Sequence, residues 1–292
     1  MVFKIPYLTF RFVIPNLAGG LEKIEISKKS VYRLIDWDGI ESVDNVISIT
    51  ENATTPGGNV SGTHINSRRI MVKFAIDDKD KTEKLRQYLI RTFHPDKEGV
   101  LYVERNGESR RINFKVENKV VFEQPNIREN KLRVTVNMLC PNPYFMDEKN
   151  TTQRFLTFAP MMSFPLAFPP AGMTTGVPLI LDGMPIDNIG DVPFGVIVNI
   201  EAYGGDMVNP MISCDDEYIR VKTTLKTGDI MQIDTRPKNK GVYINGVSTF
   251  MFERTSRFFR IEPGRSNLHI SADEGVGNAR TYIEYTNLWL GG

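Results

Sequence analysis

The chain has 292 residues, of which 41% are apolar and 24% are charged, the usual balance of a soluble globular protein. Its 36 basic and 35 acidic residues give a net charge of +1, which argues against a broad electrostatic surface for nucleic acid or an anionic membrane. The length favours two domains, each able to bury its own core. Two cysteines, Cys140 and Cys214, are too few for a disulfide framework, and we expect both to be buried thiols.

The first twenty residues have the pattern of a β-strand. Pro6 and Arg11 interrupt the apolar run that a signal peptide or a membrane span requires. Phe10, Phe12 and Ile14 instead alternate with more polar positions, and this period of two is typical of a strand. We therefore expect neither a secretory leader nor insertion into a membrane.

A long hairpin is predicted next. Residues 31–35 read as a strand that stops at the turn cluster 36–39, and a second short strand covers 46–49. Residues 53–63 are rich in Thr, Gly, Asn and Ser, and the strand pattern resumes from Ile65 to Ile76. Two readings of the 53–63 loop stay open: a mobile surface loop, or an arm that becomes ordered against a neighbouring subunit.

One amphipathic helix is predicted from Asp77 to Phe93, lying on a sheet. Acidic residues at 77, 78 and 80 are suited to cap its first turn. Leu85, Tyr88 and Leu89 then form an apolar stripe, and His94-Pro95 ends the helix because proline disfavours helical geometry in the residue before it.

Strands return after the helix and complete a first domain over residues 1–145. Residues 100–103 and 111–116 face each other across Asn106-Gly107, a strong signal for a tight hairpin. Residues 132–139 alternate regularly and stop at Cys140-Pro141. We expect a β-sandwich or barrel-like domain that carries the long hairpin and the single helix.

Residues 146–178 are rich in proline and phenylalanine, and we interpret them as a linker or an extended crossing. From 179 to 292 short strands alternate with turns, which is typical of an all-β sandwich of the jelly-roll type. The predicted strands lie at residues 179–181, 194–202, 218–221, 230–234, 242–244, 258–261, 268–270 and 282–285.

Residues that carry chemistry are nearly absent from the sequence. His64, His94 and His269 are isolated, neither cysteine has a CxxC partner, and there is no Gly-x-Ser-x-Gly motif or P-loop. Asp215-Asp216-Glu217 fits a solvated turn better than a calcium site. We therefore expect no enzymatic activity, no metal and no cofactor. Four aromatic residues of the second domain are either core residues or sugar contacts: Tyr243, Tyr282, Tyr285 and Trp289.

The order of these features resembles the distal tail protein (Dit) family of long-tailed phages that infect Gram-positive hosts. The first half carries Trp37-Asp38-Gly39, Ser67-Arg68-Arg69-Ile70, Leu85-Arg86-Gln87-Tyr88-Leu89 running into Phe93-His94-Pro95, Arg110-Arg111-Ile112 and Cys140-Pro141-Asn142-Pro143-Tyr144-Phe145. The second half carries Asn209-Pro210, Tyr218-Ile219-Arg220-Val221, Thr227-Gly228-Asp229, Ile233-Asp234-Thr235 and Ile244-Asn245-Gly246. The resemblance covers most of the chain except residues 146–178.

The resemblance implies a structural tail protein of a phage or prophage with a galectin-like second domain. It implies a homo-hexameric ring in the virion tail, made in the cytoplasm of the bacterial host and joining the tail tube protein to baseplate or tail-tip proteins. Tail-associated lysins or receptor-binding proteins are further implied partners. The first domain would form the ring, because a neighbouring copy can pair an open β edge. For the subunit contact we select Glu51, Asn52, Thr54, Thr55, Asn59, Val60, Thr63 and His64.

Three alternatives remain. A carbohydrate-binding module or adhesin that recognises host cell-wall glycans would use the four aromatic residues as its sugar contacts. A wall-degrading enzyme would need a carboxylate pair or a histidine cluster, for which the sequence gives no sign. A tail-tube subunit would explain the first domain but leave the second unexplained.

Overall fold

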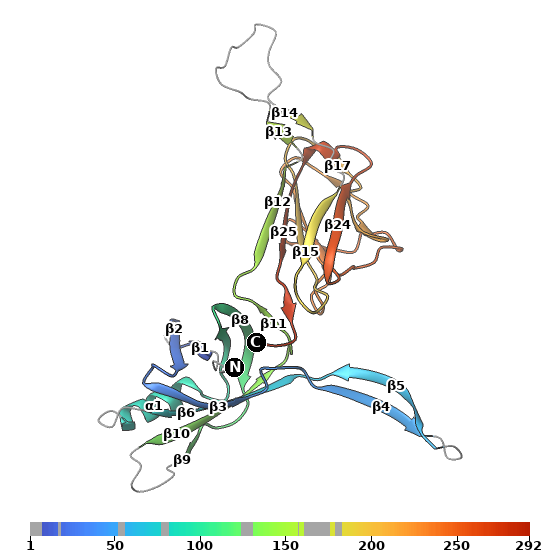
Figure 1. Ribbon diagram of the computed structural model, residues 1–292. Helices are drawn as coiled ribbons and strands as arrows, with labels where there is room; N and C mark the ends of the chain where they lie inside the picture. Colours follow the sequence, from blue (N-terminus) through green and yellow to red (C-terminus); the bar gives the residue numbers. More distant parts are fainter. Residues whose placement is uncertain are drawn as a thin grey trace, which may run out of the picture. The chain divides into compact units, whose positions relative to one another are not determined.

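A computed structural model describes residues 8–16, 19–51, 56–76, 82–123, 131–156, 158–160, 176–178 and 183–292 (Figure 1). The chain forms two compact units. Unit 1 consists of Met1–Glu148 together with Trp289–Gly292, and unit 2 consists of Lys149–Leu288. Unit 2 is therefore an insertion between two segments of unit 1.

Unit 1 is built on a barrel-like sheet. Among the described residues, seven strands follow the order β8-β7-β1-β2-β3-β6-β10, and β10 pairs back with β8 at Met138↔Val116 and Leu139↔Lys115. The pairing of β2 with β3 is parallel, whereas the others are antiparallel. The strands are β1 (Leu8–Pro15), β2 (Leu21–Ser27), β3 (Tyr32–Asp38), β6 (Arg68–Ile76), β7 (Glu98–Arg105), β8 (Glu108–Val116) and β10 (Leu132–Cys140), extended by β9 (Val121–Glu123), β11 (Phe145–Asp147) and β26 (Leu288–Trp289).

The closure of this sheet agrees with the barrel-like first domain that we expected. The strands β8 and β10 pair with each other within the same chain, so they do not supply the open edge expected in the first half. The alternation of the strands explains the core: Phe10, Phe12 and Ile14 are fully buried, and the positions between them are half-buried. Side chains from all seven strands join one hydrophobic cluster inside the barrel.

We expected the helix to cover the outer face of the sheet. Instead, α1 (Thr82–Thr92) packs against the core inside the barrel. Leu89 and Phe93 are buried in the barrel cluster, and the ring of Phe93 meets the inward-facing ring of Phe12 edge to face at 5.2 Å. The pairing of β2 with β3 spans only two residue pairs, and Thr92 next to this opening donates a hydrogen bond to Glu22 of β2. The predicted capping residues 77, 78 and 80 lie outside the described residues.

Two turns show how local sequence sets the strand ends. The β7–β8 hairpin turns at Asn106-Gly107, with φ of 55° and 91°, and this prediction is confirmed. The strand β3 continues through Trp37 to Asp38, past the turn expected at 36–39, because a bulge between Leu34 and Asp36 restores its pairing with β6.

The described part of the predicted loop at 53–63 is mostly a strand. The strands β4 (Asn45–Glu51) and β5 (Gly58–Ile65) pair with each other as a separate two-stranded sheet, which we call the arm. The arm extends away from the barrel (Figure 1). Glycine, serine and threonine in β5 indicated a loop, but backbone pairing with β4 forms a strand despite that composition.

Unit 2 is a sandwich of two antiparallel sheets with its own hydrophobic core. Within the described residues one sheet has the order β12-β25-β16-β21-β22-β23 and the other β15-β24-β18-β19. The first contains β12 (Thr151–Leu156), β25 (Ala279–Tyr285), β16 (Ile197–Ala202), β21 (Ile230–Asp234), β22 (Gly241–Ile244) and β23 (Val247–Thr249). The second contains β15 (Met184–Asn188), β24 (Gly264–Ser271), β18 (Met211–Cys214) and β19 (Glu217–Arg220). There are also two small strand pairs: β13 (Phe158–Pro160) with β14 (Gly176–Pro178), and β17 (Met207–Val208) with β20 (Thr224–Leu225).

Three segments of unit 2 differ from expectation or cannot be compared. Residues 146–178, expected as a linker or crossing, include β12, which pairs along its length with β25. The strand expected at 258–261 is reduced to one bridge between Phe194 and Ile261. The strand expected at 179–181 lies outside the described residues.

Candidate interaction surfaces

Within the described part of the chain, no group of three or more His, Cys, Asp or Glu side chains is arranged to bind a metal ion. The helices found there are too short and too polar to cross a membrane. Asp215-Asp216 is the two-residue turn between β18 and β19, with Asp215 at a φ of 51°. The candidate sites are therefore surfaces.

The register of the arm gives it two different faces. Residues directly opposite each other in an antiparallel pair project to the same side. The pairs Ile47↔Thr63 and Ile49↔Val60 thus share one face, which also carries Ile65. A bulge in β5 at Ser61 allows this, since without an extra residue Val60 would turn to the other side. We call this side, with Glu51 at its outer end, the apolar face of the arm.

The apolar face is in contact with water in the isolated chain. Ile47, Ile49, Val60 and Ile65 are 52%, 60%, 63% and 36% exposed. The opposite face carries Val46, Ser48, Thr50, Asn59 and His64. A two-stranded hairpin is marginally stable alone, and a row of exposed apolar side chains marks a contact surface. The arm thus has the properties of an element that another protein surface covers.

The residues selected from the sequence divide between these two faces. Glu51, Val60 and Thr63 lie on the apolar face, whereas Asn59 and His64 lie on the opposite one. Asn52, Thr54 and Thr55 lie outside the described residues. Sequence reasoning missed Ile47, Ile49 and Ile65, although the alternation of the two isoleucines in β4 already indicated a one-sided strand.

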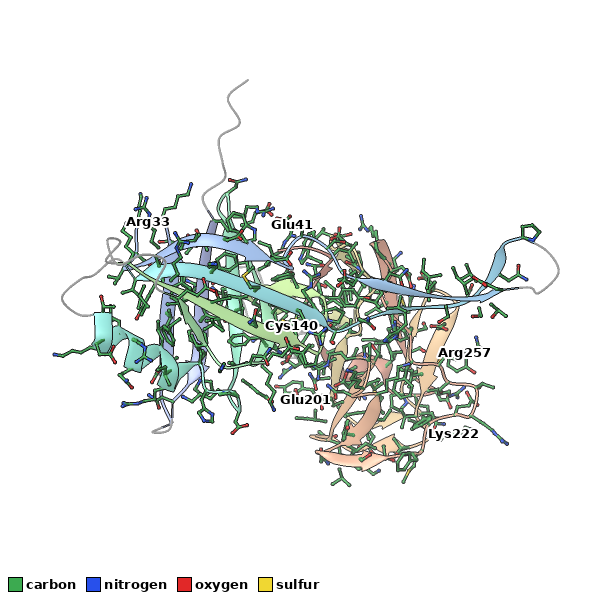
Figure 2. All side chains as sticks on the ribbon, turned by 90° about the horizontal axis from the view of Figure 1, so that it is seen from below. Arg33, Glu41, Cys140, Glu201, Lys222 and Arg257 are labelled. Atoms are coloured by element: carbon green, nitrogen blue, oxygen red, sulfur yellow. The ribbon has the colours of Figure 1, made fainter. Side chains whose placement is uncertain are left out.

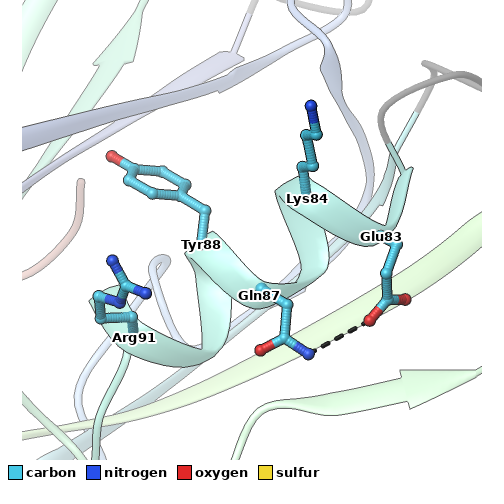
Figure 3. A pocket seen from close by; sticks show the side chains of 5 residues that line it. All are labelled: Glu83, Lys84, Gln87, Tyr88 and Arg91. Atoms are coloured by element: carbon cyan, nitrogen blue, oxygen red, sulfur yellow. Dashed lines mark hydrogen bonds between the residues drawn. The ribbon is translucent and has the colours of Figure 1, made fainter.

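A shallow hollow of about 300 Å³ lies along α1 in the same unit. Figure 3 shows its lining side chains, Glu83, Lys84, Gln87, Tyr88 and Arg91. Lys84, Tyr88 and Arg91 follow at helical spacings of four and three and therefore share one side of the helix. Burial, and secondarily the carboxylate of Glu22, raises the pKa of Tyr88, which stays an uncharged phenol at neutral pH. The hollow combines an aromatic ring with two cationic side chains.

The four aromatic residues considered as sugar contacts are not brought together. Tyr285 is 8% exposed and stacks at 5.1 Å on Phe194 in the core of unit 2. Trp289 belongs to unit 1, where its indole donates a hydrogen bond of 2.8 Å to Asp147 and Arg110 lies 4.0 Å above its ring. One ring face of each residue is therefore already in contact.

Tyr243 and Tyr282 do lie on one surface, the face of the six-stranded sheet turned away from the core. The strand register aligns them in a row of directly opposed residues, which we call the polar row: Arg154, Tyr282, Asn199, Gln232, Tyr243 and Ser248. Gln232 donates a hydrogen bond of 3.0 Å to Asn199, and Arg154 lies 5.5 Å from the centre of the Tyr282 ring. The row thus offers aromatic rings on both sides of two planar amides.

Comparison with known proteins relates both units to phage tails. Residues 20–156 match the family described as phage tail protein RIFT-related domain, and residues 189–289 match the siphovirus-type tail component, C-terminal domain. With the fold, these matches define a structural component of a phage tail, not an enzyme. The two regions cover most of the chain, and the chain belongs to the siphovirus-type distal tail protein (Dit) family.

Solved structures confirm the predicted fold of a mainly-β chain with a barrel-like first half and a sandwich. The crystal structure of the Dit protein of phage SPP1 is similar with a TM-score of 0.66 at 12% identity, covering 96% of this chain and 99% of that chain. The phage p2 baseplate in its activated conformation with Sr contains a chain with a TM-score of 0.51 at 12% identity, covering 95% and 98%. A search of curated protein sequences finds no match.

Proposed function

We propose that this protein assembles into a closed hexameric ring at the distal end of the tail tube and joins the tube to baseplate or tail-tip proteins. Unit 1 forms the ring, and unit 2 is available to bind outer components, including tail-associated lysins or receptor-binding proteins. The location is the virion tail, after synthesis in the host cytoplasm. Membership of the Dit family supports the proposal, and the SPP1 protein of this fold is described as a hub of an adsorption apparatus.

The observation that carries the ring is the apolar face of the arm. The barrel closes within the chain through β8 and β10. The open strand edges proposed to contact a neighbouring copy are therefore those of the arm, which forms its own two-stranded sheet. Burying its exposed isoleucines and valine against a neighbour gives about 1.5–3 kcal/mol for each side chain that becomes fully covered. Identical copies with such head-to-tail contacts close into a ring when the rotation between them divides a full turn.

The test is the assembly state of purified protein, followed by mass photometry over a wide concentration range and by negative-stain imaging. The wild-type chain should form a six-fold ring. Ile49→Asp should raise the concentration of half-assembly by about 100-fold, since it removes one buried side chain and introduces a charge. Val46→Asp, on the opposite face of the same strand, is the matched control and should shift it much less. A wild-type chain that stays monomeric at every concentration contradicts the ring.

A second candidate function is recognition of host cell-wall glycans by unit 2, and the polar row is the observation that favours it. Planar amides pair with sugar hydroxyls, and tyrosine rings pack on the apolar faces of sugar rings. Glycan-array binding by the purified protein should then be lost in Tyr243→Ala and in Tyr282→Ala. Phe250→Ala, at an 84% exposed aromatic residue outside the row, should leave it unchanged. Equal binding by all three variants contradicts the polar row as a glycan site.

A further inference from the structure

We infer that the hollow beside α1 is the surface that receives the arm of a neighbouring copy, with the apolar face over Tyr88 and Glu51 between Lys84 and Arg91. This inference rests on the proposed ring and adds the acceptor surface, for which no residue has yet been assigned. The acceptor must lie on unit 1, because unit 1 carries the arm and forms the ring in that proposal.

The charges at the two surfaces are opposite. Among the described residues, Lys84 and Arg91 have no ion-pair partner, and Glu51 at the outer end of the arm has none either. The arm carries a carboxylate at Glu51 and none of the described residues of β4 and β5 is Lys or Arg. Docking would therefore bring the carboxylate of Glu51 to two cations. The hollow also contains the carboxylate of Glu83, which is already paired with Arg86 at 3.1 Å.

The apolar parts of the two surfaces are also complementary. The half-buried ring of Tyr88 lies between Lys84 and Arg91 along one side of the helix, and the stems of both cations are hydrocarbon below their charged ends (Figure 3). Ile49 and Val60 are a directly opposed pair on the apolar face, close to Glu51, and together present a ridge to such a hollow.

The arrangement of unit 1 requires this contact to be intermolecular. The arm and α1 lie at opposite ends of the unit in two views at right angles (Figures 1 and 2). A chain therefore cannot place its own arm in its own hollow. A donor surface at one end and an acceptor surface at the other give a head-to-tail contact, the type that generates closed rings.

Other exposed apolar residues of unit 1 are weaker candidates for the acceptor. Leu21, Val31 and Ile35 are 64%, 46% and 44% exposed. None of them lines the hollow along α1 or the hollow around Arg105 and Arg110. In the second hollow both arginines are already paired, with Glu41 and Glu108, whereas no ion pair within the described residues occupies Lys84 or Arg91.

Charge reversal tests the pairing. Glu51→Lys should raise the concentration of half-assembly by about tenfold, because it replaces two attractions, to Lys84 and Arg91, by two repulsions. The double variant Lys84→Glu with Arg91→Glu should weaken assembly similarly, and the two sets combined in one chain should recover at least half of the loss. Lys73→Glu, a reversal at a half-buried lysine on β6 that already pairs with Glu123, is the control and should not be rescued by Glu51→Lys.

Disulfide trapping tests the proximity directly, with little background because the native Cys140 and Cys214 are buried. Mixing the single variants Ile49→Cys and Tyr88→Cys under mild oxidation should give a covalent dimer, whereas Val46→Cys with Tyr88→Cys should not. If the wild-type chain forms rings but neither rescue nor cross-linking occurs, the acceptor surface is wrong and the ring stands. If the wild-type chain remains monomeric and no cross-link forms, both are wrong.

Discussion

Arg68 should be the most sensitive basic residue of unit 1 to substitution. It is 4% exposed at the start of β6, donates hydrogen bonds to the carbonyl oxygens of Gly39, at 3.1 Å, and of Leu290, and lies 4.9 Å from the ring of Phe145. Burial lowers the pKa of Arg68. The guanidinium stays charged at neutral pH, because the ordinary pKa of arginine is far above 7. Arg68 thus ties residues 289–292 to the barrel.

The substitution Arg68→Met keeps the apolar stem and removes the guanidinium. Two partly buried hydrogen bonds to carbonyl oxygens are then lost, at about 1.5 kcal/mol each. The buried Nε, which has no partner in the described structure, is also removed, which returns about 1 kcal/mol. The net loss of unfolding free energy is about 2 kcal/mol. With a typical urea dependence, this corresponds to a midpoint about 1 M lower.

Tryptophan fluorescence during urea unfolding measures this loss in unit 1 alone, because both tryptophans, Trp37 and Trp289, belong to that unit. The control is Arg69→Met at the next residue, whose side chain is 74% exposed and pairs with Glu117. This variant should shift the urea midpoint much less, because an exposed ion pair contributes little to stability. Equal midpoints for the two variants would refute the reasoning.

Three further predictions concern the same fold. Gly107→Ala should cost about 1 kcal/mol of stability because only its positive φ is unfavourable, whereas Gly39→Ala should cost at least about 3 kcal/mol in thermal unfolding because its Cβ would collide with the carbonyl oxygen of Arg69. Burial raises the pKa of Cys140 and Cys214 to about 12, so both thiols should be unreactive to a thiol reagent at pH 8 until urea unfolds the protein. Because the unfolded thiols lose their protons at lower pH than the folded ones, the free energy of unfolding should be unaffected below about pH 9 and should fall as the pH rises toward 12. Trp289→Phe should lower the stability of unit 1 by about 1–2 kcal/mol, followed by Trp37 fluorescence, through loss of the bond to Asp147.

Local patterns were sufficient to predict many elements of this fold. Alternation identified β1 and β10, the stripe of Leu85 and Leu89 identified α1, and Asn106-Gly107 identified a hairpin turn. These signals are local because the period of the side chains and the φ angles of a turn depend on neighbouring residues. The same period does not say which strand is the partner, so the pairing of β8 with β10, which closes the expected barrel-like domain, could not be predicted.

The arm and Trp289 show why the candidate surfaces were only partly predictable. The composition of β5 indicated a loop, so the apolar face formed by Ile49 and Val60 depends on a register and a bulge that sequence alone does not specify. Trp289 follows a sandwich strand closely and was assigned to the second domain. It packs in unit 1 instead, because residues 289–292 return to the barrel.

The insertion of unit 2 between β11 and β26 has a consequence for biogenesis. These two strands are neighbours in the barrel sheet, yet the ribosome makes one about 140 residues after the other. All of unit 2 emerges between them, so the sandwich has its complete sequence before unit 1 receives Trp289. Until residues 288–290 have been synthesised, the edge of β11 has no β26 to pair with. Arg68 can then donate to the carbonyl oxygen of Gly39 but not to that of Leu290. Nascent chains are therefore expected to become competent for association only after residues 289–292 have been added.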